Sequence, residues 1–149
     1  MPTHNIFYFC GHGALDETVT PPQSVLDFTG DRYDSDQYNE REINADRTHW
    51  IHTPSNQERT YWFVMLNCCS SADASMHTAF AATAFVGWQG EPYFSTISDF
   101  NEKFWEYIKR GENTKKAMDK AWSDINHGHP PTDPPMPVHR GTPLVFTGR

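Results

Sequence analysis

Residues 5–17 read NIFYFCGHGALDE, and the change of character in the middle of this stretch governs how the fold is interpreted. The run 6–10 is apolar at every position rather than at alternate ones, which is typical of a strand buried on both faces of a sheet. The run ends at Gly11-His12-Gly13, although glycine costs backbone entropy and offers no side chain to pack. The two glycines therefore predict that the backbone approaches another group closely at this strand end.

The 149-residue chain is expected to form a single domain, residues 1–149, because this length supports one core but not two. Aromatic residues make up 14% of the sequence, which favours a packed protein over a disordered one. The formal net charge of −7 argues against nucleic acid as a partner, since a phosphate-binding surface requires an excess of Lys and Arg. The sequence shows no membrane span and no signal-peptide pattern, so we expect a cytoplasmic protein without a membrane partner.

The three cysteines, Cys10, Cys68 and Cys69, also favour a reducing compartment. Their number is odd and two of them are adjacent, so a disulfide framework is not expected. The cysteines match no common zinc pattern, and we expect neither a metal nor an organic cofactor. One or more of these thiols is therefore a candidate nucleophile.

Two further apolar runs, 60–68 and 84–88, are interpreted as buried strands. Helices are predicted from the alanine-rich composition or the three- and four-residue apolar spacing of three segments, namely 70–84, 98–111 and 113–126. Strands that alternate with helices predict an α/β fold, specifically a three-layer α/β/α arrangement around a mainly parallel sheet.

Two polar segments are interpreted as loops. Residues 14–60 are expected to form a loop-rich insertion with one short helix near 38–46. The Pro/His-rich segment 127–140 is expected to be a loop that leads to a final strand over 142–148. A metal site formed by its histidines (His127, His129, His139) is the alternative to a solvated loop.

The first two predicted strands carry the residues with the most distinctive chemistry. The carboxyl ends of parallel strands share one edge of a sheet, and His12 and the Cys68-Cys69 pair follow the first and second strand. Neighbouring strands would bring an imidazole and a thiol within reach of each other, as nucleophilic catalysis requires. The backbone N–H groups of Gly13 and Cys69 are candidates to bind the oxyanion of an acyl-transfer intermediate.

The order and spacing of several segments resemble those of the caspase-like cysteine peptidases, which include caspases, metacaspases, gingipains, separases and CHAT domains. The segment FYFCGHG is followed by FVMLNCCSSAD, so that Cys69 lies 57 residues after His12. The segment AATAFVGWQG is similar to the next strand of the family, and FWEYIKRGENTKKAMDKAW is similar to its two following helices, above all in CHAT domains. The resemblance covers about residues 5–125.

This resemblance implies a cysteine endopeptidase, a hydrolase of protein or peptide substrates, in which Cys69 is the nucleophile and His12 is the base and proton donor. Cys69 is preferred to Cys68 because the second cysteine attacks in the metacaspase pattern Asp-Cys-Cys-His-Ser-Gly. Gly13 and Cys69 would supply the oxyanion N–H groups.

The resemblance also implies two substrate-binding residues. Asn67 occupies the position at which metacaspases carry an aspartate for a basic P1 residue, so basic specificity is not expected here. Trp88 follows the next strand, where relatives line the S1 pocket.

The strands that precede the histidine strand in the family are missing from this sequence, because only five residues come before residue 6. The strand over 5–10 is therefore expected to be an exposed apolar edge, covered in a homo-oligomer or by a partner chain. A fragment of a longer protein is the competing explanation. Two other functions remain open at this point, a non-catalytic assembly module that pairs through this strand and a thiol hydrolase that does not act on peptides.

Overall fold

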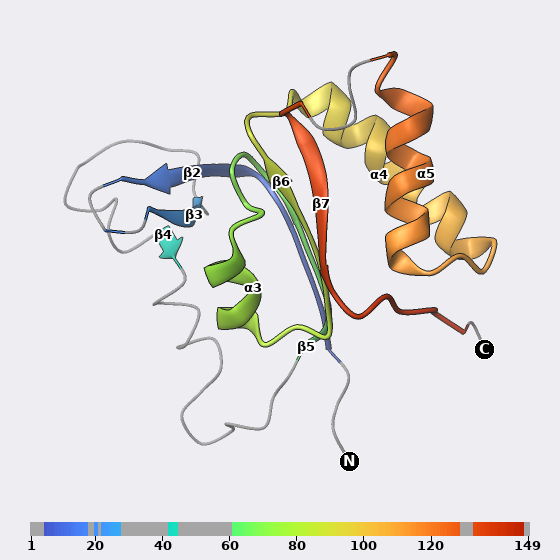
Figure 1. The fold of residues 1–149 in the computed structure, drawn as a ribbon, viewed down its shortest axis with the longest axis horizontal. Coiled ribbons are helices and arrows are strands. Elements are labelled where there is room, and N and C mark those ends of the chain that lie inside the picture. The colour runs from blue at the N-terminus through green and yellow to red at the C-terminus, as the bar shows by residue number, and fades with distance from the viewer. Residues whose placement is uncertain are drawn as a thin grey trace.

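A four-stranded sheet forms the centre of the protein, here described from a computed structural model (Figure 1). The strand order is β1 (Asn5–Cys10), β5 (Tyr61–Asn67), β6 (Ala84–Gln89) and β7 (Met136–Gly141), with β7 alone antiparallel to its neighbour. The predicted α/β fold with a mainly parallel sheet is confirmed. The structure describes residues 5–17, 20, 22–27, 42–44, 61–128 and 133–147.

Helices cover both faces of this sheet, α3 (Ala74–Phe80) on one and α4 (Phe94–Lys109) and α5 (Thr114–Ile125) on the other (Figure 1). Alternate residues of β5 enter the two cores, because successive side chains of a strand point to opposite faces. The residues Phe63 and Met65 pack with α4 and α5, whereas Val64 and Leu66 pack with α3.

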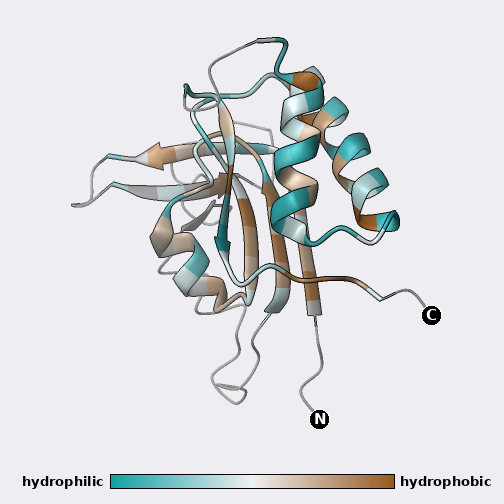
Figure 2. Cartoon of the chain, turned by 45° about the vertical axis from the view of Figure 1, so that its right-hand side comes forward, coloured by the Kyte–Doolittle hydropathy of each residue, from teal (hydrophilic) through white to brown (hydrophobic). Residues whose placement is uncertain are grey.

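The two long helices follow from apolar spacing and from their ends. The buried residues Ile97, Phe100, Phe104 and Ile108 recur along one face of α4, and the hydrophilic residues of both helices face outward (Figure 2). The side chain of Asn113 caps α5 by accepting the N–H of Lys116. The predictions over 98–111 and 113–126 are confirmed, although α4 begins earlier, at Phe94.

The first helix of the series is shorter than predicted. Only Ala74–Phe80 of the segment 70–84 is helical, and residues 70–73 form a loop that leads out of β5. This loop is fixed by hydrogen bonds to its surroundings rather than by helix formation, as described for the candidate site below.

A second, antiparallel sheet follows β1 directly and consists of β2 (His12–Asp16), β3 (Gln23–Asp27) and β4 (Glu42–Asn44). Within the predicted loop-rich insertion 14–60, residues 14–16 of β2 and all of β3 are paired strands rather than loop. The short helix predicted near 38–46 is wrong for residues 42–44, which pair with β3. The rest of that segment, and most of the predicted insertion 14–60, lies outside the described residues.

The last strand, β7, lies earlier in the sequence than the predicted strand 142–148. Within the predicted loop 127–140, residues from Met136 onward form β7, which extends to Gly141. Pro137 lies opposite Trp88 in this strand, and its missing N–H is tolerated because β7 is at the edge of the sheet. The predicted strand 142–148 is wrong for its described part, 142–147, because Leu144 and Phe146 pack against the core without strand pairing.

No helix in the described part of the chain has both the length and the apolar character that crossing a membrane requires.

Candidate active site

The segments that contain His12 and Cys69 leave the sheet side by side. Cys10 and Asn67 are paired in the parallel register of β1 and β5, and they are the last residues of their strands. The N–H of Gly11 then donates to the carbonyl of Asn67 at 3.3 Å. The residues that follow therefore begin from neighbouring positions at one end of the sheet.

Gly13 brings the two segments into contact. A Cβ atom at this position would lie 2.5 Å from the carbonyl oxygen of Cys69 and 2.9 Å from the Sγ of Cys68. No other residue type fits there without moving the cysteine loop. The close backbone approach predicted from the glycines is thus present, and the group approached is the Cys68-Cys69 peptide itself.

The two adjacent cysteines differ in their environment. Cys68 is fully buried, and burial raises the pKa of its thiol to about 12. Cys69 is half-exposed, and its pKa is raised first by partial burial and then by the carboxylate of Glu91. Cys69 is therefore the accessible thiol of the pair. Cys10, on β1, is exposed.

The loop after Cys69 adopts a backbone conformation that is rare for its residue type. Ser70 has φ = 53°, in the left-handed region. Hydrogen bonds on both sides of the residue hold it there, because its N–H donates to the carbonyl of Gly90 at 2.8 Å and its carbonyl accepts from the hydroxyl of Ser24. Such enforced strain is concentrated at functional sites.

The buried side chain of Ser71 also holds this loop in place. Its buried hydroxyl lies 2.8 Å from the carbonyl of Leu66 and 2.9 Å from that of Cys68, and it accepts the N–H of Trp88 at 2.9 Å. The position of the Cys69 backbone is therefore determined by strands β5 and β6 together.

Asn67 and Trp88, the predicted substrate-binding residues, are fully buried beneath this loop. The indole N–H of Trp88 donates to Oδ1 of Asn67 at 3.0 Å, and the Asn67 amide donates to Oδ1 of Asn101 at 2.8 Å. Asn101 in turn donates to the hydroxyl of Tyr8 at 2.6 Å. The polar groups of Asn67 and Trp88 are thus engaged in a chain of hydrogen bonds that runs from the core to the surface.

His12 is exposed and is in contact with an aromatic ring from α4. Its imidazole meets the ring of Phe94 edge to face, with the centroids 5.5 Å apart and the planes at 86°. Phe94 and the preceding Tyr93 are exposed by 57% and 79%. Neither residue belongs to the candidate site residues predicted from the sequence, although two adjacent aromatic residues shortly after the third predicted strand are a signal that could have indicated them.

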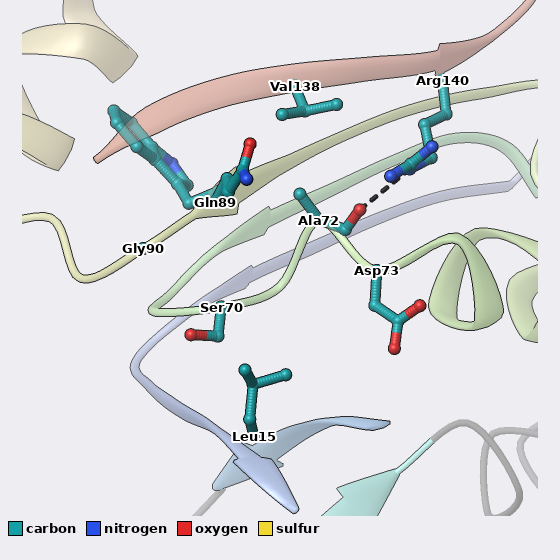
Figure 3. Close-up of a pocket in the computed structure, with 9 residues that line it drawn as sticks. Leu15, Ser70, Ala72, Asp73, Gln89, Gly90, Val138 and Arg140 are labelled. Carbon is teal, nitrogen blue, oxygen red and sulfur yellow. Dashed lines mark hydrogen bonds between the residues drawn. The ribbon is translucent and has the colours of Figure 1, made fainter. Parts of the chain in front are cut away.

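A pocket of about 310 Å³ adjoins the cysteine loop (Figure 3). Ser70 forms part of its wall, together with the end of β6 at Gln89 and Gly90. Arg140 of β7 enters the same pocket, and its Nε–H donates to the carbonyl of Ala72 at 2.8 Å. The pocket is large enough for one amino-acid side chain. Its full lining comprises Leu15, Ser70, Ala72, Asp73, Trp88, Gln89, Gly90, Val138 and Arg140.

The histidines of the 127–140 segment do not converge in the described residues. His139 lies in β7, where its Nε2 is 2.8 Å from the hydroxyl of Thr114, and burial lowers its pKa to about 4. His129 lies outside the described residues. In the part of the chain that the structure describes, no three His, Cys, Asp or Glu side chains are grouped so as to hold a metal ion.

Comparison of the sequence with models of known protein families and with curated protein sequences gave no match.

Proposed function

We propose that this chain is a caspase-like cysteine endopeptidase that cleaves protein or peptide substrates through Cys69 and His12. The observation that carries the proposal is the contact of Gly13 with the Cys68-Cys69 peptide, because it joins the histidine and cysteine segments at the carboxyl end of the parallel strands. The burial of Cys68 and the accessibility of Cys69 support Cys69 as the nucleophile.

Partial burial and the carboxylate of Glu91 raise the pKa of Cys69, so the proposed mechanism uses His12 as a base in its first step. His12 takes the proton of the Cys69 thiol as sulfur attacks the carbonyl carbon of the scissile bond, so that a C–S bond forms. The N–H groups of Gly13 and Cys69 donate to the resulting oxyanion. His12 then gives the proton to the leaving nitrogen as the C–N bond breaks, and water hydrolyses the thioester to restore the thiol.

The pocket beside Ser70 is the proposed site for the substrate side chain on the acyl side of the scissile bond. Trp88 is among the residues that line this pocket, and its side chain is otherwise fully buried. In this proposal Asn67 does not bind the substrate directly, because both polar groups of its side-chain amide are already hydrogen-bonded within the protein. It supports the site from the core.

The proposal is tested by peptide cleavage. Wild-type protein is incubated with a peptide library, and the products are identified by mass spectrometry. Cys69→Ala and His12→Ala are each expected to lower the cleavage rate by about 10³-fold or more. Cys10→Ser is the matched control, because Cys10 is an exposed thiol on the edge strand, and it should retain wild-type activity. A wild-type chain that cleaves no peptide, or a Cys69→Ala variant as active as wild type, would contradict the proposal.

One observation favours the second candidate, a non-catalytic module that assembles through β1. Within the described residues β1 pairs only with β5, and its Ile6 and Tyr8 side chains are exposed by 52% and 45%. A second copy or a partner chain would cover this apolar edge. This proposal predicts a dimer in light scattering at micromolar concentration that Ile6→Lys converts to a monomer. A wild-type monomer at that concentration would contradict pairing between copies.

A further inference from the structure

Tyr93 and Phe94, at the start of α4, are large apolar residues whose side chains are exposed. The apolar residues farther along α4, such as Ile97 and Phe100, are buried against the sheet. Tyr93 and Phe94 instead direct two aromatic side chains into solvent at the helix start, where they contribute little to the core. Their exposed area is therefore available to bind another molecule.

The segment that carries these rings, residues 90–94, contacts the cysteine loop at one end and His12 at the other. At its beginning, the carbonyl of Gly90 accepts the N–H of Ser70, the residue after Cys69. At its end, the ring of Phe94 contacts the imidazole of His12. The carboxylate of Glu91, between them, is close enough to raise the pKa of Cys69. Residues 90–94 thus form a wall that extends from the candidate nucleophile to the candidate proton donor.

The position of His12 indicates which part of a substrate meets this wall. A proton donor must come within about 3 Å of the leaving nitrogen. The residue that carries this nitrogen is P1′. In a bound substrate it therefore lies beside His12, next to the Phe94 ring that contacts the imidazole.

We propose that Phe94, with Tyr93 beside it, forms an apolar subsite for the P1′ residue and selects large aromatic or aliphatic side chains there. This inference rests on the proposed function, since P1′ is defined by cleavage at Cys69. Glu91, in the same segment, disfavours an acidic residue at this position. The subsite takes a peptide substrate whose scissile bond is followed by Phe, Tyr or Leu.

The test varies only the P1′ residue. A peptide that the wild-type chain cleaves is synthesised with Phe, Leu, Ser or Asp at P1′, and kcat/KM is measured for each. Burial of a large side chain predicts that Phe and Leu exceed Ser by about tenfold, with Asp lowest. Phe94→Ala should reduce the Phe-to-Ser ratio to about one, because kcat/KM for the Phe peptide should fall by more than kcat/KM for the Ser peptide. Phe94→Leu should keep part of the preference, and Tyr93→Ala should reduce it less.

Val145→Ala is the matched control, because Val145 is an exposed apolar residue outside α4 and beside Leu144 and Phe146, which pack against the core. This variant should retain the full wild-type preference. Thermal unfolding of each variant verifies that the exposed substitutions leave the fold intact. Cleavage by wild type without P1′ preference, or an equal loss for all peptides in Phe94→Ala, overturns the subsite and leaves the proposed function standing. A wild-type chain that cleaves no peptide overturns both.

Discussion

The carboxyl end of the sheet consists of two regions that differ in how their side chains are used. The lower region, which we call the floor, comprises Asn67, Ser71 and Trp88. All three are buried, and their side-chain polar groups form hydrogen bonds with strands β5 and β6 or with α4. Removal of one partner would leave a buried polar group without a hydrogen bond, which is costly.

The upper region, which we call the rim, comprises His12, Cys69, Tyr93 and Phe94. These side chains are exposed or half-exposed, and none of them belongs to the buried core. The rim is held in place through its backbone, above all by the contact of Gly13 with the cysteine loop. The buried floor therefore fixes the backbone on which Cys69 lies, while the side chains of the rim remain accessible. Floor variants should therefore reduce stability, and rim variants should reduce activity.

The largest effect on stability is expected at Gly13, where rim and floor meet. Gly13→Ala places a Cβ atom 2.5 Å from the Cys69 carbonyl oxygen, so the cysteine loop must shift. We expect the free energy of unfolding to fall by about 3 kcal/mol in urea denaturation. Gly11→Ala is the comparison and should cost less, because its Cβ would meet only side-chain atoms of Phe9 and no backbone atom of the cysteine loop. Equal stability of Gly13→Ala and wild type would show that the two segments are not packed as described.

A smaller loss is expected for Asn67→Leu in the floor. This substitution removes the acceptor of the buried Trp88 indole N–H and should lower the free energy of unfolding by about 2 kcal/mol. Tyr8→Phe is the matched comparison, because it removes only the hydroxyl at the exposed outer end of the same hydrogen-bond chain. Denaturation curves in which Tyr8→Phe costs as much as Asn67→Leu would contradict the distinction between buried and accessible residues at this end of the sheet.

The smallest effect is expected at Glu91, which acts on the rim by charge alone. Glu91→Gln removes a negative charge that raises the pKa of Cys69, so the thiolate fraction should increase. Alkylation of Cys69 at pH 8, followed by mass spectrometry of the labelled peptide, should be a few-fold faster than in wild type. Glu102→Gln, on α4, should leave the rate unchanged. A slower rate in Glu91→Gln would reverse the assigned electrostatic effect.

The central strands and the long helices could be predicted from the sequence because their signals are local. The dense apolar runs mark β1, β5 and β6, and the periodic apolar residues mark α4 and α5. The strands β4 and β7 gave no such signal. Residues 42–44 form a strand through pairing with β3, and β7 tolerates Pro137 because it lies at an edge.

The site could be predicted only in part, for a related reason. His12 and Cys69 stand out as candidates in the sequence because each follows an apolar strand. The hydrogen-bond chain from Trp88 through Asn67 and Asn101 to Tyr8 joins residues far apart in sequence, and no spacing rule relates them. The contact of Phe94 with His12 likewise depends on how α4 is placed over the end of the sheet.

Cys69 and His12 are proposed to act together in one reaction, and a double-mutant cycle of peptide cleavage is the sharpest test of this joint action. Cleavage rates are measured for wild type, Cys69→Ala, His12→Ala and the double variant on one peptide. Residues that act as a unit lose nearly all activity in either single variant, so the double variant should be no slower than the singles. Losses that multiply in the double variant, or a single variant that retains wild-type activity, would contradict the account.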